Sequence, residues 1–255
     1  MWVQGSTAAL RAPIVAIVGA RAATSYALAT AKRIAGDLAS AGLVVASGMA
    51  RGVDSAAHRG ALTAPGATVG VLGSGVDVVY PAEHRSLARD IEAQGGAIIS
   101  ELVPGTPPQP QFFPLRNRII SGLSRAVLIV EAGEKSGSLI TARCALDQGR
   151  DVLAVPGNVL SGRNRGGHAL LRDGAKIVES ADDILEELGM PASARPGAPA
   201  PDDPVLRGLP AGESFDLEAI SERTGLTPAR LLPRLFELEM RGLVRRVGGG
   251  RFARV

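Results

Sequence analysis

Short, uniformly apolar runs alternate with helical segments through the first 190 residues, and this alternation restricts the fold more than any other feature. Runs such as "IVAIVGA" (14–20) and "AVLIVEA" (126–132) are almost free of polar side chains, which is typical of strands covered on both faces. Between them, segments such as "TSYALATAKRIAGDLASAG" (24–42) repeat apolar residues at helical spacing. The pattern predicts an α/β domain with a doubly wound, mostly parallel sheet of the extended Rossmann-like type.

A change of composition after residue 190 marks a second unit. The segment "PASARPGAPAPDDP" (191–204) is rich in Pro and Ala, which indicates a semi-rigid linker between an α/β domain at 1–190 and a small domain at 205–255. In the small domain, two helix patterns meet at Gly225 and a basic hairpin follows, which predicts a winged helix. Pro233 lies inside the second pattern, so we expect it to kink that helix or to delay its start.

The charge distribution separates the two units. The chain has a net charge of only +3, and from residue 205 onward it carries nine Lys or Arg against six Asp or Glu. The first 204 residues therefore carry equal numbers of cations and anions. An anion site in the α/β domain must depend on a local concentration of positive charge.

Neither a membrane span nor a secretory pathway is indicated by the sequence. No apolar run approaches the roughly 18 residues that a span requires, and the N-terminus "MWVQGSTAAL" lacks the basic and apolar regions of a signal peptide. The single cysteine, Cys144, has no partner for an internal disulfide. We therefore expect a cytoplasmic protein.

The turn after the first apolar run favours contact with a phosphate. The sequence there is "VGARAAT", in which Gly19 permits a tight turn and Arg21 can donate two hydrogen bonds to an anion. Neither G-x-G-x-x-G nor G-x-x-x-x-G-K-[ST] occurs, so ordinary dinucleotide and P-loop binding are disfavoured.

The turn after the next apolar run, "SGMARGVDSAAH", has a similar composition. Ser47, Gly48 and Arg51 are candidates for holding an anionic ligand. Asp54 and His58 share one helix face, but no nucleophile or set of metal ligands accompanies them. We interpret Asp54 as a helix cap and His58 as a packed or locally hydrogen-bonded side chain.

A third turn, "EAGEKSGSLITA", combines a lysine, hydroxyl groups and glycines at the start of a helix. Its candidate residues are Lys135, Ser136, Gly137 and Ser138. One such turn is weak support for an anion site. Three turns at the carboxyl ends of strands in one parallel sheet are stronger support, because the topology brings those ends to one edge.

A basic and aromatic cluster, "FFPLRNRIISGLSR", precedes the apolar run at 126–132. Its candidate residues are Phe112, Phe113, Arg116, Asn117 and Arg118. We expect a helix to start at Pro114, which places the arginines in its first turn, where positive charge opposes the helix dipole. An anionic ligand would compensate for this placement, and one phenylalanine can stack on a base, a contact that contributes about 1–3 kcal/mol.

These motifs together resemble the DNA-processing protein A (DprA/Smf) family. The resemblance rests on "VAIVGARAAT", "SGMARGVDSAAH", "VLGSGVDVVYPAEH", "FFPLRNRIISGLSRAVLIVEAGEKSGSLITA" and "AVPGN", and covers about residues 13–190. The tail is similar to the winged-helix domain of that family. The sequence departs from the family pattern at Gln109 and Gln111, where members often carry a basic residue, and it lacks the small N-terminal helical domain of many members.

The resemblance implies a protein that binds single-stranded DNA without catalysis and without a cofactor or metal. Family members protect incoming single strands in natural transformation, help to load the RecA recombinase, displace single-strand-binding protein and work as homodimers through the Rossmann-like domain. Arg21, Arg116, Arg118 and Lys135 are expected to contact phosphates. Backbone amides near Gly48 and Gly137 would assist, and direct readout of base sequence is not expected.

Two other functions remain open from the sequence. Nucleotide-cleaving enzymes of the phosphoribohydrolase type share this architecture, but they carry P-G-G-x-G-T where this chain has "EAGEKSGS", with Glu131 and Glu134 but no diglycine. Alternatively, the basic winged helix of a regulator would read duplex DNA in the major groove.

Overall fold

The computed structural model describes residues 1–190, 203–209, 214–240, 243–247 and 250–254. The chain divides into two compact units, residues 1–193 and 194–255. The linker predicted at 191–204 falls almost entirely outside the described residues.

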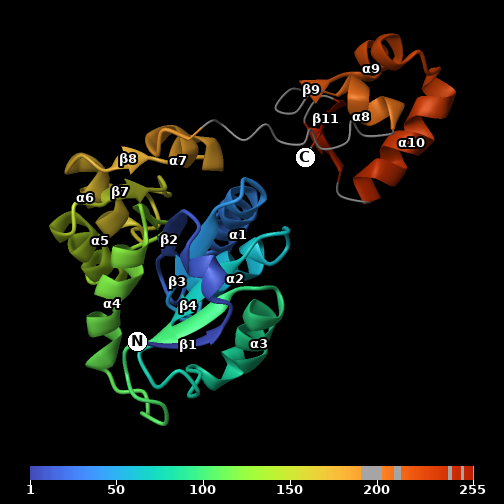
Figure 1. Ribbon diagram of the computed structural model, residues 1–255. Helices are drawn as coiled ribbons and strands as arrows, with labels where there is room; N and C mark the ends of the chain where they lie inside the picture. The colour runs from blue at the N-terminus through green and yellow to red at the C-terminus, as the bar shows by residue number, and fades with distance from the viewer. Residues whose placement is uncertain (191–202, 210–213, 241–242, 248–249, 255) are drawn as a thin grey trace. The chain divides into compact units, whose positions relative to one another are not determined.

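The larger unit is built on a sheet of eight strands among the described residues, in the order β1-β5-β4-β3-β2-β6-β7-β8 (Figure 1). The strands are β1 (Trp2–Gly5), β2 (Ile14–Val18), β3 (Val44–Ser47), β4 (Thr68–Val71), β5 (Ala97–Ser100), β6 (Ala126–Ile129), β7 (Asp151–Ala154) and β8 (Lys176–Ile177). All neighbours pair in parallel except β1, which runs antiparallel to β5. The prediction of a doubly wound, mostly parallel sheet is confirmed, and the strand order reverses direction between β2 and β6.

Helices cover both faces of this sheet (Figure 1). They are η1 (Thr7–Leu10), α1 (Ser25–Ser40), α2 (Val53–Ala61), η2 (Ala82–His84), α3 (Arg85–Ala93), α4 (Phe112–Leu123), α5 (Ser138–Asp147), α6 (Arg165–Arg172) and α7 (Ala181–Glu187). α1, α2 and α7 pack on one face, where α3 covers the β4–β5 end, and η1, α4, α5 and α6 pack on the other. Both faces of the parallel strands are therefore buried, as their continuous apolar sequences require.

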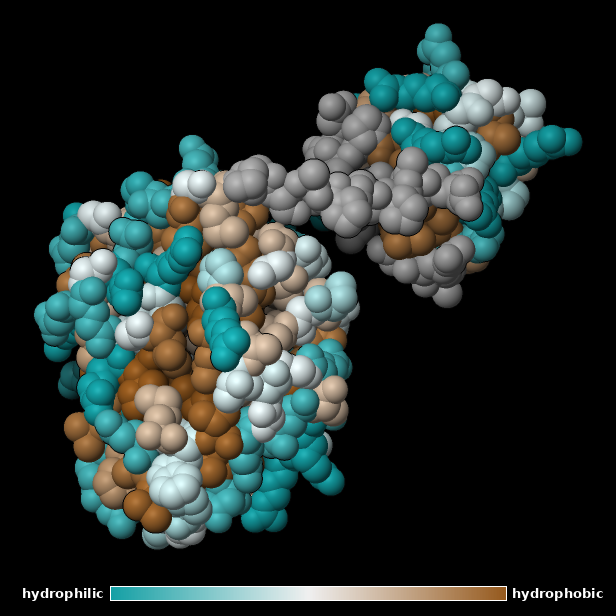
Figure 2. Space-filling model, in the orientation of Figure 1, coloured by the Kyte–Doolittle hydropathy of each residue, from teal (hydrophilic) through white to brown (hydrophobic). Residues whose placement is uncertain are grey.

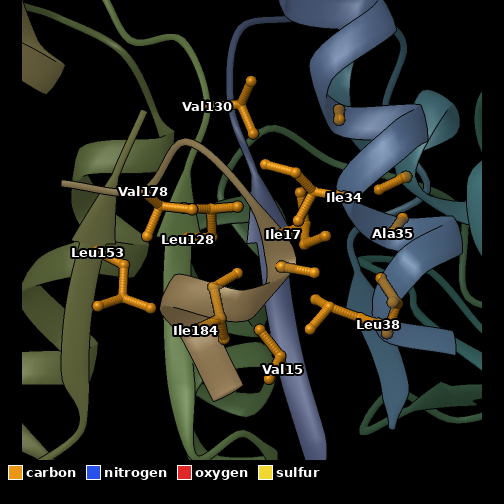
Figure 3. Close-up of a cluster of buried hydrophobic side chains, with 14 of the residues drawn as sticks. Val15, Ile17, Ile34, Ala35, Leu38, Leu128, Val130, Leu153, Val178 and Ile184 are labelled. Carbon is orange, nitrogen blue, oxygen red and sulfur yellow. The ribbon is translucent and has the colours of Figure 1, made fainter. Parts of the chain in front are cut away.

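Alternate residues of β2 supply the cores on its two sides. Val15 and Ile17 pack with α1 and α7, as Figure 3 shows, whereas Ala16 and Val18 face α4 and α5. All four are buried, and each large apolar side chain of this kind contributes about 1.5–3 kcal/mol by leaving water. Hydrophobic residues also form a band down the middle of the larger unit in Figure 2, flanked by hydrophilic residues.

The start of α1 is fixed by a side-chain cap. Thr24 has extended backbone angles, and its hydroxyl oxygen accepts a hydrogen bond from the Ala27 amide at 3.2 Å. The helix ends at Ser40, and Gly42 follows with a φ of +83°, which suits glycine. The cap therefore sets the boundary between the β2–α1 turn and the helix.

The smaller unit is a winged helix with a core of its own. Its elements are α8 (Pro204–Gly208), β9 (Ser214–Phe215), α9 (Leu217–Thr224), α10 (Pro228–Met240), β10 (Val244–Val247) and β11 (Arg251–Arg254), with the sheet order β10-β11-β9. α10 begins at Pro228 and continues through Pro233, so of the two expected effects of Pro233 the delayed start is wrong, and the kink stays a prediction. Leu232 and Phe236 on α10 are 44% and 57% exposed.

Among the described residues, no helix has the length and apolar character needed to cross a membrane.

Candidate nucleic-acid interface

The three glycine-containing turns meet at the carboxyl edge of the sheet, where the strand order reverses. A cleft of about 770 Å³ opens there and is lined by the turns that follow β2, β3 and β6 and by α4 and α5. We call it the strand-end cleft. The residues proposed from the sequence that line it are Gly19, Arg21, Phe113, Arg116, Asn117, Lys135, Ser136, Gly137 and Ser138. Segments distant in the sequence are thus brought together as the topology predicts.

Two cations in the strand-end cleft are exposed. Arg21 and Lys135 form no ion pair with a carboxylate within the described part of the chain. The Arg21 guanidinium carbon lies 5.4 Å from the ring centroid of Phe113, which indicates a cation–π contact. The ring of Tyr80 also contacts Phe113, with the two ring centroids 5.5 Å apart. The cleft therefore combines accessible positive charge with an aromatic surface.

Arg116 has a different environment from the one we expected. Its side chain is only 8% exposed, and Nη1 donates hydrogen bonds to the carbonyl oxygens of Gly48, at 2.5 Å, and of Val71. Burial lowers the pKa of this arginine to about 10, while the nearby Asp54 carboxylate opposes the shift. The guanidinium is therefore engaged in joining α4 to the ends of β3 and β4, which differs from the free phosphate contact expected of it.

Asp54 organises the turn that follows β3. Its Oδ2 accepts hydrogen bonds from the amides of Gly48 and Ala50, at 3.0 and 3.3 Å. It lies one residue inside α2, for which Gly52 is the N-cap, so Asp54 does not cap the helix as we expected. Burial raises the pKa of this carboxyl group, and Arg116 opposes the shift. Since the Gly48 amide already donates to Asp54, the expected assistance from that amide does not fit this geometry.

His58 is fully buried, in agreement with a structural role. Its Nδ1 lies 2.8 Å from Oγ1 of Thr68, and that hydroxyl donates to the Val45 carbonyl oxygen at 2.6 Å. The histidine must therefore carry its proton on Nδ1, which leaves Nε2 as a buried nitrogen without a hydrogen-bond partner among the described residues. Burial lowers the pKa of His58 to about 3. The neutral ring is suited to packing rather than to proton transfer near neutral pH.

α4 begins earlier than the sequence suggested. Its first residue is Phe112, so Pro114 is its third residue and Arg116 and Arg118 lie beyond the first turn. Neither arginine therefore opposes the helix dipole in the first turn, in contrast to our expectation. Asn117 joins this helix to the next turn, because its Nδ2 donates to the Gly137 carbonyl oxygen at 3.3 Å.

Five of the proposed residues do not line the strand-end cleft. They are Ser47, Gly48, Arg51, Phe112 and Arg118. The Ser47 hydroxyl is buried and donates to the Ile17 carbonyl oxygen. Arg51 forms two hydrogen bonds with Glu83, at 2.7 and 2.8 Å, and with Gly48 it lines a small adjoining cavity of about 80 Å³.

Arg118 is also held by a carboxylate. Its Nη2 lies 2.5 and 2.6 Å from the two carboxylate oxygens of Glu101. Phe112 is half-buried, and Phe113 is the phenylalanine in the cleft. The sequence left open which ring is accessible to a ligand, and the structure places Phe113 there.

The turn before α5 supplies hydroxyl groups and a helix N-terminus. Gly137 is the N-cap of α5, but the amides of Leu139 and Ile140 already donate to the Ser136 and Gly137 carbonyl oxygens, and the Ser138 amide donates to the Ser136 hydroxyl. The hydroxyl oxygens of Ser136 and Ser138 are 2.7 Å apart, so one hydroxyl donates a hydrogen bond to the other. This turn therefore offers an anion its hydroxyl groups and Lys135 rather than free helix amides.

Sequence reasoning missed Tyr80 as a site residue. It lies in "VVYPAEH" after β4, lines the strand-end cleft and is 43% exposed. An aromatic residue followed by a proline in a turn was the available signal, since exposed aromatic rings in turns suit ligand contact better than packing.

Groups for metal or acid–base chemistry are not gathered in this cleft. Among the described residues no group of three or more His, Cys, Asp or Glu side chains could hold a metal ion. Glu134 forms an ion pair of 3.6 Å with Arg165, and Glu131 accepts hydrogen bonds from the Thr24 amide and hydroxyl at 3.2 and 2.7 Å. Neither glutamate lines the strand-end cleft.

The sequence and fold are similar to those of known proteins. Protein Smf of Escherichia coli is 39% identical over 262 residues, which cover 98% of this chain and 70% of that protein. A structure of DNA processing protein A from Streptococcus pneumoniae matches with a TM-score of 0.68 and 42% identity, over 72% of this chain and 65% of that chain. A second structure, of DNA processing protein A from Helicobacter pylori, concerns the single-stranded DNA binding mode of that protein. It matches with a TM-score of 0.67 and 32% identity, over 73% of this chain and 85% of that chain.

Two family models account for nearly all of the chain. The model of the DprA winged helix domain matches residues 193–250, and the model of DNA recombination-mediator protein A matches residues 1–189. The chain spans 61% to 70% of the length of the first curated relatives. The sheet order, the converging turns and these matches agree, and the chain belongs to the DNA recombination-mediator protein A (DprA/Smf) family.

Proposed function

We propose that this protein binds single-stranded DNA in the strand-end cleft. The observation that carries the proposal is the arrangement of Arg21, Lys135 and Phe113 in one cleft, where both cations lack a carboxylate partner among the described residues. Cations that track a backbone and an aromatic ring that stacks on a base are the elements of sequence-tolerant binding to single strands. The related Helicobacter pylori protein, whose single-stranded DNA binding mode has been described, supports the same assignment.

The experiment is a salt titration of binding to a fluorescent thymine oligonucleotide. Arg21→Gln and Lys135→Gln each remove one phosphate contact, so each is expected to weaken binding and to reduce the slope of log K against log salt by about 0.7. Arg118→Gln is the matched control, because Arg118 is exposed but paired with Glu101 outside the cleft. An Arg21→Gln slope equal to that of the wild type would contradict the proposal.

Within recombination, we assign the protein the role of a mediator in the cytoplasm. It protects incoming single strands during natural transformation, displaces single-strand-binding protein and helps to load RecA. Membership of the recombination-mediator family supports this role. The test is RecA filament formation on DNA coated with single-strand-binding protein. Stimulation by the wild type and its loss in Arg21→Gln are expected, whereas equal stimulation by both would separate the cleft from the loading step.

We also propose that the protein acts as a homodimer through its larger unit. β8 is one of the two edge strands of the sheet within the described residues, it has only two residues, and Ile177 on it is 58% exposed. An exposed apolar side chain on an open strand edge favours pairing with a second copy. Light scattering after size-exclusion chromatography is expected to give a dimer for the wild type and a monomer for Ile177→Arg. A wild-type monomer at micromolar concentration would refute this assignment.

We propose no catalytic activity. A phosphoribohydrolase requires a carboxylate that can attack the glycosidic linkage of a nucleotide whose phosphate is held in the same cleft, whereas Glu131 and Glu134 lie outside the strand-end cleft and Asp54 is occupied by two backbone amides. Incubation with nucleoside monophosphates, followed by chromatography, is expected to release no free base.

The duplex-reading regulator is also less favoured, because α10 presents exposed Leu232 and Phe236. Tighter binding of duplex than of single strands by the full chain would favour it instead.

A further inference from the structure

A second cavity lies beside the strand-end cleft. Its volume is about 390 Å³, and it lies between the start of α1, the end of β6 and the loop that follows β7. Its lining residues are Thr24, Tyr26, Val130, Glu131, Pro156, Gly157, Asn158, Ser161 and Asn164. We call it the Glu131 cavity. Its volume is in the range of cavities that hold small molecules.

The chemistry of the Glu131 cavity differs from that of the strand-end cleft. No Lys or Arg side chain is part of its described lining, so a phosphate group has no countercharge there. Its central charged group is the carboxylate of Glu131, which is only 6% exposed. Each oxygen of this carboxylate accepts one hydrogen bond from Thr24 and keeps a lone pair for a further donor. The cavity therefore suits an uncharged ligand that donates hydrogen bonds.

One wall of the cavity is aromatic and its position is fixed. Tyr26 lies in the first turn of α1, and its hydroxyl donates to the Pro156 carbonyl oxygen at 3.3 Å. The ring is 56% exposed, so one face is accessible. Val130 and Pro156 supply further apolar lining. A planar heterocycle can stack on such a ring while its edge is directed at the carboxylate.

The two cavities share their dividing wall. Residues 18–22 line the strand-end cleft, and Thr24, two residues later, lines the Glu131 cavity. In the segment that follows β6, Gly133 lines the cleft and Glu131 lines the cavity. Arg163 donates to the Ala22 carbonyl oxygen at 3.2 Å and so ties the loop after β7 to this wall. A DNA strand that is held by Arg21 and Lys135 therefore passes within reach of the Glu131 cavity.

We infer that the Glu131 cavity receives one unstacked base of the strand bound in the adjoining cleft, and that guanine is the preferred base. The inference rests on the proposed single-stranded DNA binding. Guanine presents two N–H donors side by side, from N1 and the 2-amino group, which match the two oxygens of a carboxylate. Cytosine and adenine offer one amino group at the corresponding edge, and thymine offers one imino group. A preference at a single position departs from the sequence-independent binding expected from the motifs alone.

Competition binding with four oligonucleotides at one salt concentration tests the inference. The oligonucleotides are a thymine 20-mer and three versions with a single central guanine, cytosine or adenine. The wild type is expected to bind the guanine version at least about five-fold more tightly than the thymine 20-mer, the lower limit for a good bidentate contact. Glu131→Gln is expected to abolish this difference, because an amide cannot accept both donors. Glu134→Gln, which removes the same charge three residues after Glu131 and outside the cavity, is the matched control and is expected to retain the difference.

A variant on the other wall keeps the inference testable if Glu131→Gln does not fold. Tyr26→Leu removes the stacking surface at an exposed position. It is expected to reduce the ratio of the affinities for the guanine version and the thymine 20-mer to less than half of the wild-type ratio. Equal binding of all four oligonucleotides by the wild type, with a normal salt slope, would overturn this inference and leave the proposed function standing. Failure of the wild type to bind the thymine 20-mer would instead contradict the proposed function.

Discussion

Replacement of Arg116 by methionine tests whether this arginine stabilises the fold or contacts DNA. The change preserves much of the side-chain volume but removes the donors to the Gly48 and Val71 carbonyl oxygens. It also leaves the buried Asp54 carboxylate without the cation that stabilises its charged form. Loss of a charged donor that leaves buried acceptors unsatisfied costs about 1–3 kcal/mol. We expect Arg116→Met to lower the free energy of unfolding by that amount.

Fluorescence of Trp2 during urea unfolding measures this effect. Trp2 is the single tryptophan and lies in β1, which pairs with β5, so its signal reports on the larger unit. Asp54→Asn in the Arg116→Met background is expected to recover part of the lost stability, because it removes the unpaired charge. A loss below about 1 kcal/mol, together with a reduction of the DNA salt slope equal to that of Arg21→Gln, would refute the reasoning and make Arg116 a phosphate ligand.

Three further predictions follow from single side chains. His58 has a folded-state pKa of about 3 against an ordinary value of 6.5, so the unfolded chain binds a proton more readily than the folded one. The free energy of unfolding is therefore at its full value above pH 6.5 and is expected to fall by about 2–3 kcal/mol by pH 4.5. Urea unfolding should find a smaller loss in His58→Gln. Gly48→Ala places a Cβ 2.3 Å from the Arg116 guanidinium, which is expected to cost about 1–3 kcal/mol in a melting experiment, and much less when Arg116 is already methionine. Phe113→Leu is expected to weaken binding of a thymine oligonucleotide by about 1–3 kcal/mol in fluorescence anisotropy, with Phe112→Leu as the control that changes affinity little.

The sheet and the meeting of its turns could be predicted from the sequence. Runs such as 14–20 and 126–132 are almost free of polar side chains and do not alternate between apolar and polar residues. This pattern indicates strands that are buried on both faces. Parallel topology then placed Gly19 and Lys135 at one edge without any contact having to be known.

The environment of Arg116 could not be predicted in the same way. Its burial depends on the close approach of Gly48 and on a carbonyl oxygen of β4, 45 residues away in the sequence. The start of α4 was placed at Pro114 because proline favours the first helical position. A proline at the third position is equally acceptable, since the first four amides of a helix have no partner within it.

The carboxylates that pair with Arg51 and Arg118 affect how fast an anion reaches the strand-end cleft. Glu83 and Glu101 cancel the two cations beyond the cleft, and residues 1–193 carry 18 Lys or Arg against 17 Asp or Glu, a net charge of only +1. The field of the larger unit therefore decays within a short distance, and a polyanion in solution is not steered toward it. Association is then limited by random encounter, at about 10⁵–10⁷ M⁻¹s⁻¹. Added salt should act mainly by shortening the lifetime of the complex rather than by slowing its formation.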